Sequence, residues 1–98
     1  MDEREIYKEK ARAKLDLLMA RIEVLQAQVR DKTADAKLDV NARIDELQSK
    51  RTDLEDRMQK AQNASGDAWT EFKRGIDYAL EDVGRALERA GEALERTP

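Results

Sequence analysis

One short interruption divides a chain that is otherwise patterned for helix along nearly its whole length. Ser65, Gly66 and Asp67 separate a helical pattern of about sixty residues from a second one of about thirty. We expect Gly66 to adopt the left-handed conformation that ends a helix, and Ser65 or Asp67 to cap the next helix. The sequence therefore predicts a helix over residues 3–64, a turn at residues 65–67, and a second helix over residues 67–96.

Composition agrees with an all-α fold in a single domain spanning residues 1–98. Charged residues make up 42% of the chain and aromatic residues only 4%. Such values occur in disordered chains and in long helices, but here the strong helix formers recur with helical spacing. No segment alternates apolar and polar residues with the period of two that a half-buried strand requires.

The first segment carries one apolar stripe along its length. Its members are separated by steps of three and four residues, apart from a step of seven between Leu47 and Leu54, which places them on one face of a helix. They are Tyr7, Ala11, Leu15, Leu18, Ile22, Leu25, Val29, Thr33, Ala36, Val40, Ile44, Leu47, Leu54, Met58 and Ala61.

The C-terminal segment has a wider apolar face, built from columns that repeat every seven residues. The columns are Trp69, Ile76, Val83 and Ala90, then Leu80, Leu87 and Leu94, then Phe72, Ala79, Ala86 and Ala93. A face of this width predicts contact with two neighbouring helices. Gly84 and Gly91 lie beside these columns, and we expect close helix packing to offset their unfavourable helix propensity.

Folding the chain back near residue 65 brings the two apolar faces into an antiparallel register. The expected pairs are Trp69 with Ala61, Phe72 with Met58, Ile76 with Leu54, Val83 with Leu47, Leu87 with Ile44, Ala90 with Val40, and Leu94 with Ala36. Leu80 is the exception, because it faces Arg51, whose charge must reach water or an acidic partner. Trp69, Phe72 and Tyr7 meet at one end, either as a core plug or as an exposed apolar tip.

Residues 1–30 also need a cover for their stripe, which includes Leu18, Ile22 and Leu25. A second turn near residues 31–35 would give a monomeric three-helix bundle. A straight helix would form the same contacts between two chains, as an antiparallel, domain-swapped homodimer. We favour the homodimer, because no glycine or proline lies near Thr33 and no capping-box Glu or Gln follows it.

The chain lacks the residues that most enzymes and metal sites use. It contains no histidine and no cysteine, so the commonest general base, the commonest transition-metal ligand and any disulfide are missing. Its glycines are isolated from one another, so no phosphate-binding loop can form. We therefore expect no catalytic residue, no cofactor, no metal site and no enzyme activity.

Charge and hydropathy argue against nucleic acid and membrane partners. The 19 basic and 22 acidic residues are interspersed, giving a net charge of −3 without a basic patch. No apolar run is long enough to span a bilayer, and residues 1–5 have no signal-peptide character, which predicts a cytoplasmic protein. Acid-to-base pairs four residues apart should decorate the exposed helix surface: Asp39–Arg43, Glu46–Lys50, Asp53–Arg57, Asp56–Lys60, Glu81–Arg85 and Glu92–Arg96.

Two segments carry a resemblance to a known group of proteins. They are Ala64-Ser65-Gly66-Asp67-Ala68-Trp69 with Phe72-Lys73-x-Gly75, and Ile44-Asp45-Glu46-Leu47 with Lys50-Arg51-x-Asp53. Together they resemble short bacterial cytoplasmic coiled-coil proteins, some of which are stress-response proteins. The resemblance implies a structural or interaction protein with a stress-associated role, and it assigns no catalytic residue.

Two functional hypotheses follow. In the favoured one, the chain is a non-catalytic helical protein that binds itself as a homodimer and, through its helical surface, an unidentified protein partner. In the alternative, it is a peripheral lipid- or client-binding protein whose amphipathic helices open to expose their apolar faces.

Overall fold

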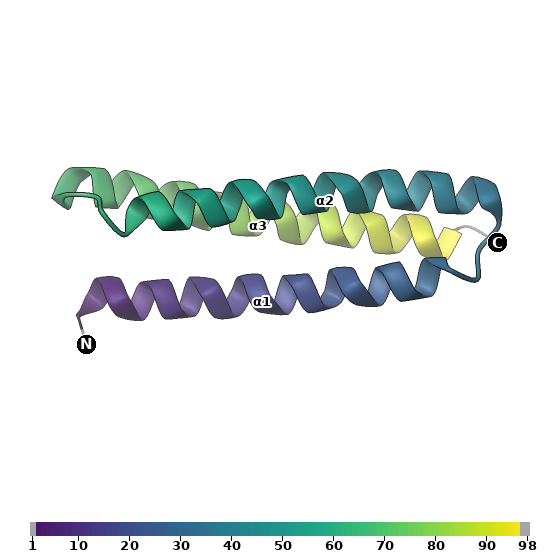
Figure 1. The fold of residues 1–98 in the computed structure, drawn as a ribbon, viewed down its shortest axis with the longest axis horizontal. Helices are drawn as coiled ribbons and strands as arrows, with labels where there is room; N and C mark the ends of the chain where they lie inside the picture. Colours follow the sequence, from purple (N-terminus) through teal and green to yellow (C-terminus); the bar gives the residue numbers. More distant parts are fainter. Residues whose placement is uncertain (1, 97–98) are drawn as a thin grey trace.

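The computed structural model describes residues 2–96, which form three helices packed side by side. They are α1 (Glu3–Val29), α2 (Ala34–Ala61) and α3 (Gly66–Arg96). The molecule is a rod of 50 × 20 × 16 Å in which consecutive helices run antiparallel (Figure 1). The beginning of α1 lies at the same end as the α2–α3 turn. The predicted all-α class is confirmed, and the chain forms a three-helix bundle.

The expected continuous helix over residues 3–64 is wrong, because the chain turns at residues 30–33. Thr33 has extended backbone angles (φ −64°, ψ 163°), and its hydroxyl accepts a hydrogen bond from the Ala36 amide at 3.4 Å. A threonine N-cap starts a helix without glycine, proline or a capping-box partner. The turn lets the apolar stripe of α1 pack within its own chain, as in the three-helix alternative.

The second turn also differs from the expectation. It occupies residues 62–65, and Gly66 is the first residue of α3. No glycine in the described part of the chain has a positive φ, so the left-handed role expected for Gly66 is wrong. Instead, the last turn of α2 tightens through bonds such as Gln62 N to Gln59 O at 3.2 Å, which satisfy carbonyls at the helix end.

Two neighbouring clusters of apolar side chains fill the interior. The first contains Ile22, Leu25, Val29, Val40, Ile44, Leu47, Val83, Ala86, Leu87, Ala90 and Leu94, with Leu18 packed against it. The second contains Ala11, Leu15, Leu54, Ala61, Ile76 and Leu80, with Tyr7, Leu18, Met19, Met58, Trp69, Phe72 and Ala79 packed against it. The expected antiparallel partners therefore lie in the same cluster, apart from Ala36, which is buried outside both.

The two glycines of α3 are not sites of close helix packing, contrary to the expectation. A Cβ atom built on Gly84 or Gly91 would meet no heavy atom of its surroundings within 4 Å. The small residues that α3 buries in the bundle are instead Ala86, Ala90 and Ala93. The glycines therefore weaken α3 without a compensating contact.

Replacing Gly84 with alanine should stabilise the protein. The added methyl group has room, and alanine is about 0.5–1 kcal/mol more favourable than glycine inside a helix. Urea denaturation monitored by circular dichroism should show a higher midpoint with an unchanged slope. A lower midpoint would mean that a neighbour approaches Gly84 closely.

Replacing Thr33 with alanine tests the first turn. Loss of the N-cap should lower the free energy of unfolding by about 1 kcal/mol. Thr52→Ala is the matched control, because Thr52 lies within α2 and its hydroxyl only contacts the Gln48 carbonyl. If residues 30–34 were helical instead, Thr33→Ala would stabilise the protein, since alanine is the better helix former.

Candidate functional site

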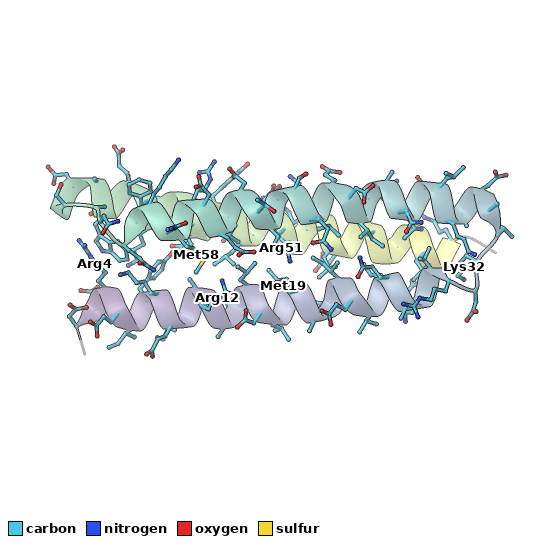
Figure 2. The ribbon with its side chains drawn as sticks, in the orientation of Figure 1. Arg4, Arg12, Met19, Lys32, Arg51 and Met58 are labelled. Carbon is cyan, nitrogen blue, oxygen red and sulfur yellow. The ribbon has the colours of Figure 1, made fainter. Side chains whose placement is uncertain are left out.

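Aromatic and cationic side chains gather at the end of the bundle where α1 begins. The rings of Tyr7 and Trp69 meet edge to face, with centroids 5.4 Å apart and an interplanar angle of 87°. The Arg4 guanidinium lies 4.6 Å from the centroid of the Trp69 ring and donates a hydrogen bond to the Ala64 carbonyl at 2.8 Å. Figure 2 shows Arg4 and Met58 at this end. These contacts tie α1 to the α2–α3 turn.

The Tyr7 hydroxyl joins α1 to α3. It donates a hydrogen bond to Asp77 Oδ1 at 2.6 Å and lies 3.1 Å from the Lys73 carbonyl oxygen. Burial, followed by the hydrogen bond to Asp77 and the charge of that carboxylate, raises the pKa of Tyr7 well above its usual value of 10.0. The phenol therefore keeps its proton to a higher pH than an exposed tyrosine would, and its hydrogen bond joins α1 to α3.

The aromatic residues at the end of the bundle where α1 begins are neither fully buried nor fully exposed. Trp69, Phe72 and Met58 are all half-buried, and all pack against the second apolar cluster. Their inner edges contact the core, whereas their outer edges reach solvent.

A salt bridge joins the middle of α2 to α3. Lys50 Nζ lies 2.5 Å from Asp82 Oδ2. The hydrogen bond between them raises the pKa of Lys50 and lowers the pKa of Asp82. Both side chains are paired with each other at the edge of the core, so this pair stabilises the α2–α3 contact.

Arg51, which faces Leu80 in the expected register, pairs with an acid on its own helix. Its Nε lies 3.4 Å from Glu55 Oε1, and Glu55 Oε2 lies 4.0 Å from Arg12 Nη1 of α1. Arg12 and Arg51 both lie on the α1–α2 side of the bundle (Figure 2). Glu55 therefore links α1 and α2, whereas Leu80 is buried and lines the groove between α1 and α3.

The predicted surface ion pairs are confirmed with one exception. Pairs four residues apart form at Asp39–Arg43, Glu46–Lys50, Asp53–Arg57, Asp56–Lys60 and Glu81–Arg85. In the described part of the chain no ion pair joins Glu92 to Arg96. These exposed pairs each contribute little to stability.

A second apolar stripe runs along the outer face of α1, away from the core. Three of its members are the exposed large residues Ile6, Leu17 and Val24, with 42%, 62% and 55% of their surfaces accessible. Steps of eleven and seven residues separate them, which correspond to nearly whole numbers of helical turns. Exposed alanines at positions 13, 20 and 27 fill the same face. We call this set the outer stripe: Ile6, Ala13, Leu17, Ala20, Val24 and Ala27.

Charged residues border the outer stripe in rows of opposite sign. Glu9, Asp16 and Glu23 form the acidic flank, and Lys14 and Arg21 form the basic flank. The basic flank faces α3, because Lys14 and Arg21 line open grooves between the two helices. The grooves are floored by apolar residues and bordered on α3 by Asp77, Glu81, Glu88, Glu92 and Glu95.

The acidic flank lies on the side of α2. Asp16 pairs with Arg12 at 3.3 Å, and Arg12 extends toward Glu55 of α2. Among residues 2–96, Glu9, Glu23, Lys14 and Arg21 have no ion-pair partner. The charges beside the outer stripe are therefore mostly available to another molecule.

The packing residues predicted from the sequence lie together in the two apolar clusters. The predicted turn residues Ser65, Gly66 and Asp67 are not part of the outer stripe or its flanks. Leu18, Ile22, Leu25, Leu47, Val83, Leu87 and Leu94 meet in the first cluster, and Leu54, Met58, Trp69, Phe72, Ile76 and Leu80 in the second. Ser65, Gly66 and Asp67 lie at the start of α3, where the Ser65 carbonyl accepts the Trp69 amide at 2.7 Å.

The outer stripe was not predicted from the sequence, although the sequence contains a signal for it. Ile6, Ala13, Ala20 and Ala27 recur every seven residues, as do Leu17 and Val24. The alanines are a weak signal for an interaction surface, because alanine is a good helix former on any face of a helix. Apolar residues on two opposite faces leave α1 only weakly amphipathic, and only the inner of its two stripes was predicted from the sequence.

Comparisons with family models, curated proteins and solved structures found no match for this chain. Within residues 2–96, no three acidic side chains are grouped closely enough to hold a metal ion, and no helix is long and apolar enough to cross a membrane. The outer stripe with its two flanks is the candidate functional surface, because it exposes the large apolar residues Ile6, Leu17 and Val24.

The Tyr7 bond to Asp77 predicts a shifted alkaline titration. In a Tyr78→Phe background, Tyr7 is the remaining tyrosine, and its tyrosinate absorbance should rise only above pH 10.0. Asp77→Asn should lower this midpoint by about one pH unit or more, whereas Glu88→Gln on the same helix should not.

The same bond predicts a loss of stability at high pH. Since the folded-state pKa is raised, the bond stabilises the protein below pH 10 and is lost as the pH rises through the folded-state value. A tyrosinate titration midpoint near pH 10.0 for Tyr7 would contradict the hydrogen bond between Tyr7 and Asp77 that joins α1 to α3.

Proposed function

We propose that this chain is a non-catalytic helical-bundle protein that acts by binding another protein through the outer stripe of α1. The observation that carries the proposal is the exposure of Ile6, Leu17 and Val24 on one face. The opposite face of α1 fills the core with Ala11, Leu15, Ile22, Leu25 and Val29. Contiguous exposed apolar surface with a charged border is typical of protein interaction sites.

The absence of a catalytic role is part of this proposal. The polar groups with shifted pKa values are Tyr7, Lys50 and Asp82, and each bonds to a neighbouring helix. Shifted pKa values also arise in structural contacts, and here they lie at helix–helix junctions instead of converging on a cavity. A stress-associated role belongs to the proposal only through the resemblance to bacterial coiled-coil proteins.

Self-association by domain swapping has less support than binding through the outer stripe. A swapped homodimer needs residues 30–33 to become helical, which would remove the Thr33 cap. It would leave the outer stripe exposed in both chains, because swapping exchanges only the contacts of the core.

The lipid-binding alternative also has less support. Opening the bundle would expose the buried faces of all three helices, including Leu15, Leu47 and Leu54, which have no accessible surface. The outer stripe itself is bordered by Glu9, Asp16 and Glu23, which anionic lipid headgroups would repel.

Site-specific photo-crosslinking in extracts of the source cells tests the proposal. A photoreactive residue at position 17 should crosslink to protein, whereas the same residue at position 38 should not. Leu38 is the matched control, because it is an exposed leucine, 73% accessible, and the one exposed large hydrophobic residue of α2. Leu17→Gln with Val24→Gln should abolish capture by a probe at position 20. Equal crosslinking at positions 17 and 38 would contradict the proposal.

A further inference from the structure

We propose that the partner of the outer stripe is a second copy of this chain, paired with its α1 parallel and in register. This inference rests on the proposed function, since it names the occupant of the same surface. The spacing of the outer stripe, the order of the charges along it and the position of Lys10 each support it.

The outer stripe has the spacing of a two-stranded coiled coil. Ile6, Ala13, Ala20 and Ala27 occupy one heptad column, and Lys10, Leu17 and Val24 occupy the other, alternating by steps of three and four. The alanines leave room for two helix axes to approach closely. The stripe runs over nearly the whole of α1, so the contact would extend along the long axis of the rod.

The charges on the two flanks select the parallel orientation. Two of the three acidic flank residues precede a basic flank residue by five positions: Glu9 precedes Lys14, and Asp16 precedes Arg21, whereas Glu23 precedes the neutral Gln28. Residues five apart cannot pair on one helix, because they lie on opposite sides of the stripe. In a parallel, in-register coiled coil these are the flanking positions that meet across the interface, and symmetry repeats each pair.

The antiparallel orientation is disfavoured by the same charges. It would bring acidic flank against acidic flank and basic flank against basic flank, which is repulsive. In the parallel pairing, Lys14 and Arg21 lie between the partner's acidic flank and the acids of α3 that border the grooves, including Glu81 and Glu88. The basic flank then neutralises acidic residues on both of its sides.

Lys10 supports the in-register pairing of the two α1 helices. It occupies a column position where an apolar residue would give the strongest contact, and it is exposed near the beginning of α1. A single lysine at such a position weakens a coiled coil but favours one register and the two-stranded state. Lys10→Leu should therefore strengthen the self-association.

Two single-cysteine variants test orientation and register, since the natural chain has no cysteine. Ala13→Cys and Ala27→Cys lie fourteen positions apart, about 21 Å along a helix. In the parallel dimer both should give crosslinked dimers with a short bismaleimide reagent. Ser49→Cys on the exposed face of α2 is the control and should stay uncrosslinked. An antiparallel pairing could crosslink one variant at most, and a swapped dimer neither, so either result would overturn the inference.

Paired charge reversal tests the flanks. The variant Glu9→Lys with Asp16→Lys places basic residues opposite the partner's Lys14 and Arg21, and the variant Lys14→Glu with Arg21→Glu places acidic residues opposite the partner's Glu9 and Asp16. Each variant alone should self-associate at least about tenfold more weakly than the natural protein, and mixing the two should restore dimers as heterodimers. Recovery on mixing also shows that both variants fold. No weakening, or no recovery, would overturn the inference.

Light scattering over a concentration series separates this inference from the proposed function. The natural protein should approach twice the chain mass at high concentration, and Leu17→Gln with Val24→Gln should remain monomeric. A natural protein that stays monomeric to about 1 mM overturns self-pairing. The proposed function then still stands if the probe at position 17 captures a different protein, and it falls if that probe captures nothing.

Discussion

The width of the apolar face of α3 is the constraint on which the rest of the bundle depends. Val83, Leu87 and Ala90 contact the inner residues of both other helices within one cluster. A narrower face could cover only α1 or α2 and would leave the other stripe to a second chain. Because α3 covers the inner stripes of both α1 and α2, the core is completed within one chain. The outer stripe of α1 is therefore not needed for the core and remains exposed.

The register of α2 against α3 was predictable because a short turn near residue 65 fixes their alignment, and the apolar residues of the two helices match in that alignment. The position of the first break was not predictable by the same argument, because the contacts of Ile22 and Leu25 are identical within a chain and between chains. Only the local cap distinguishes the two, and Thr33 is a weaker signal than glycine or proline. The left-handed role expected for Gly66 failed because the end of α2 tightens instead.

The electrostatic contacts were only partly predictable. Pairs four residues apart follow from helix geometry, and most of them form. The contacts between helices do not follow from spacing alone. Tyr7 was expected at the end where Trp69 and Met58 meet, but its bond to Asp77 and the position of Arg4 over Trp69 depend on side-chain conformations. These contacts fix how α1 lies on the other two helices and thus which of its faces is turned outward.

An odd number of antiparallel helices separates the two ends of the described chain by the length of the rod (Figure 1). Anything joined before α1 emerges some 50 Å from anything joined after α3. Side-by-side alignment of two rods through α1 would gather both leading ends at one pole and both trailing ends at the other. The two ends of such a dimer would then differ. Segments joined before α1 in the two chains would lie together at one end of the rod, and segments joined after α3 would lie together at the other end.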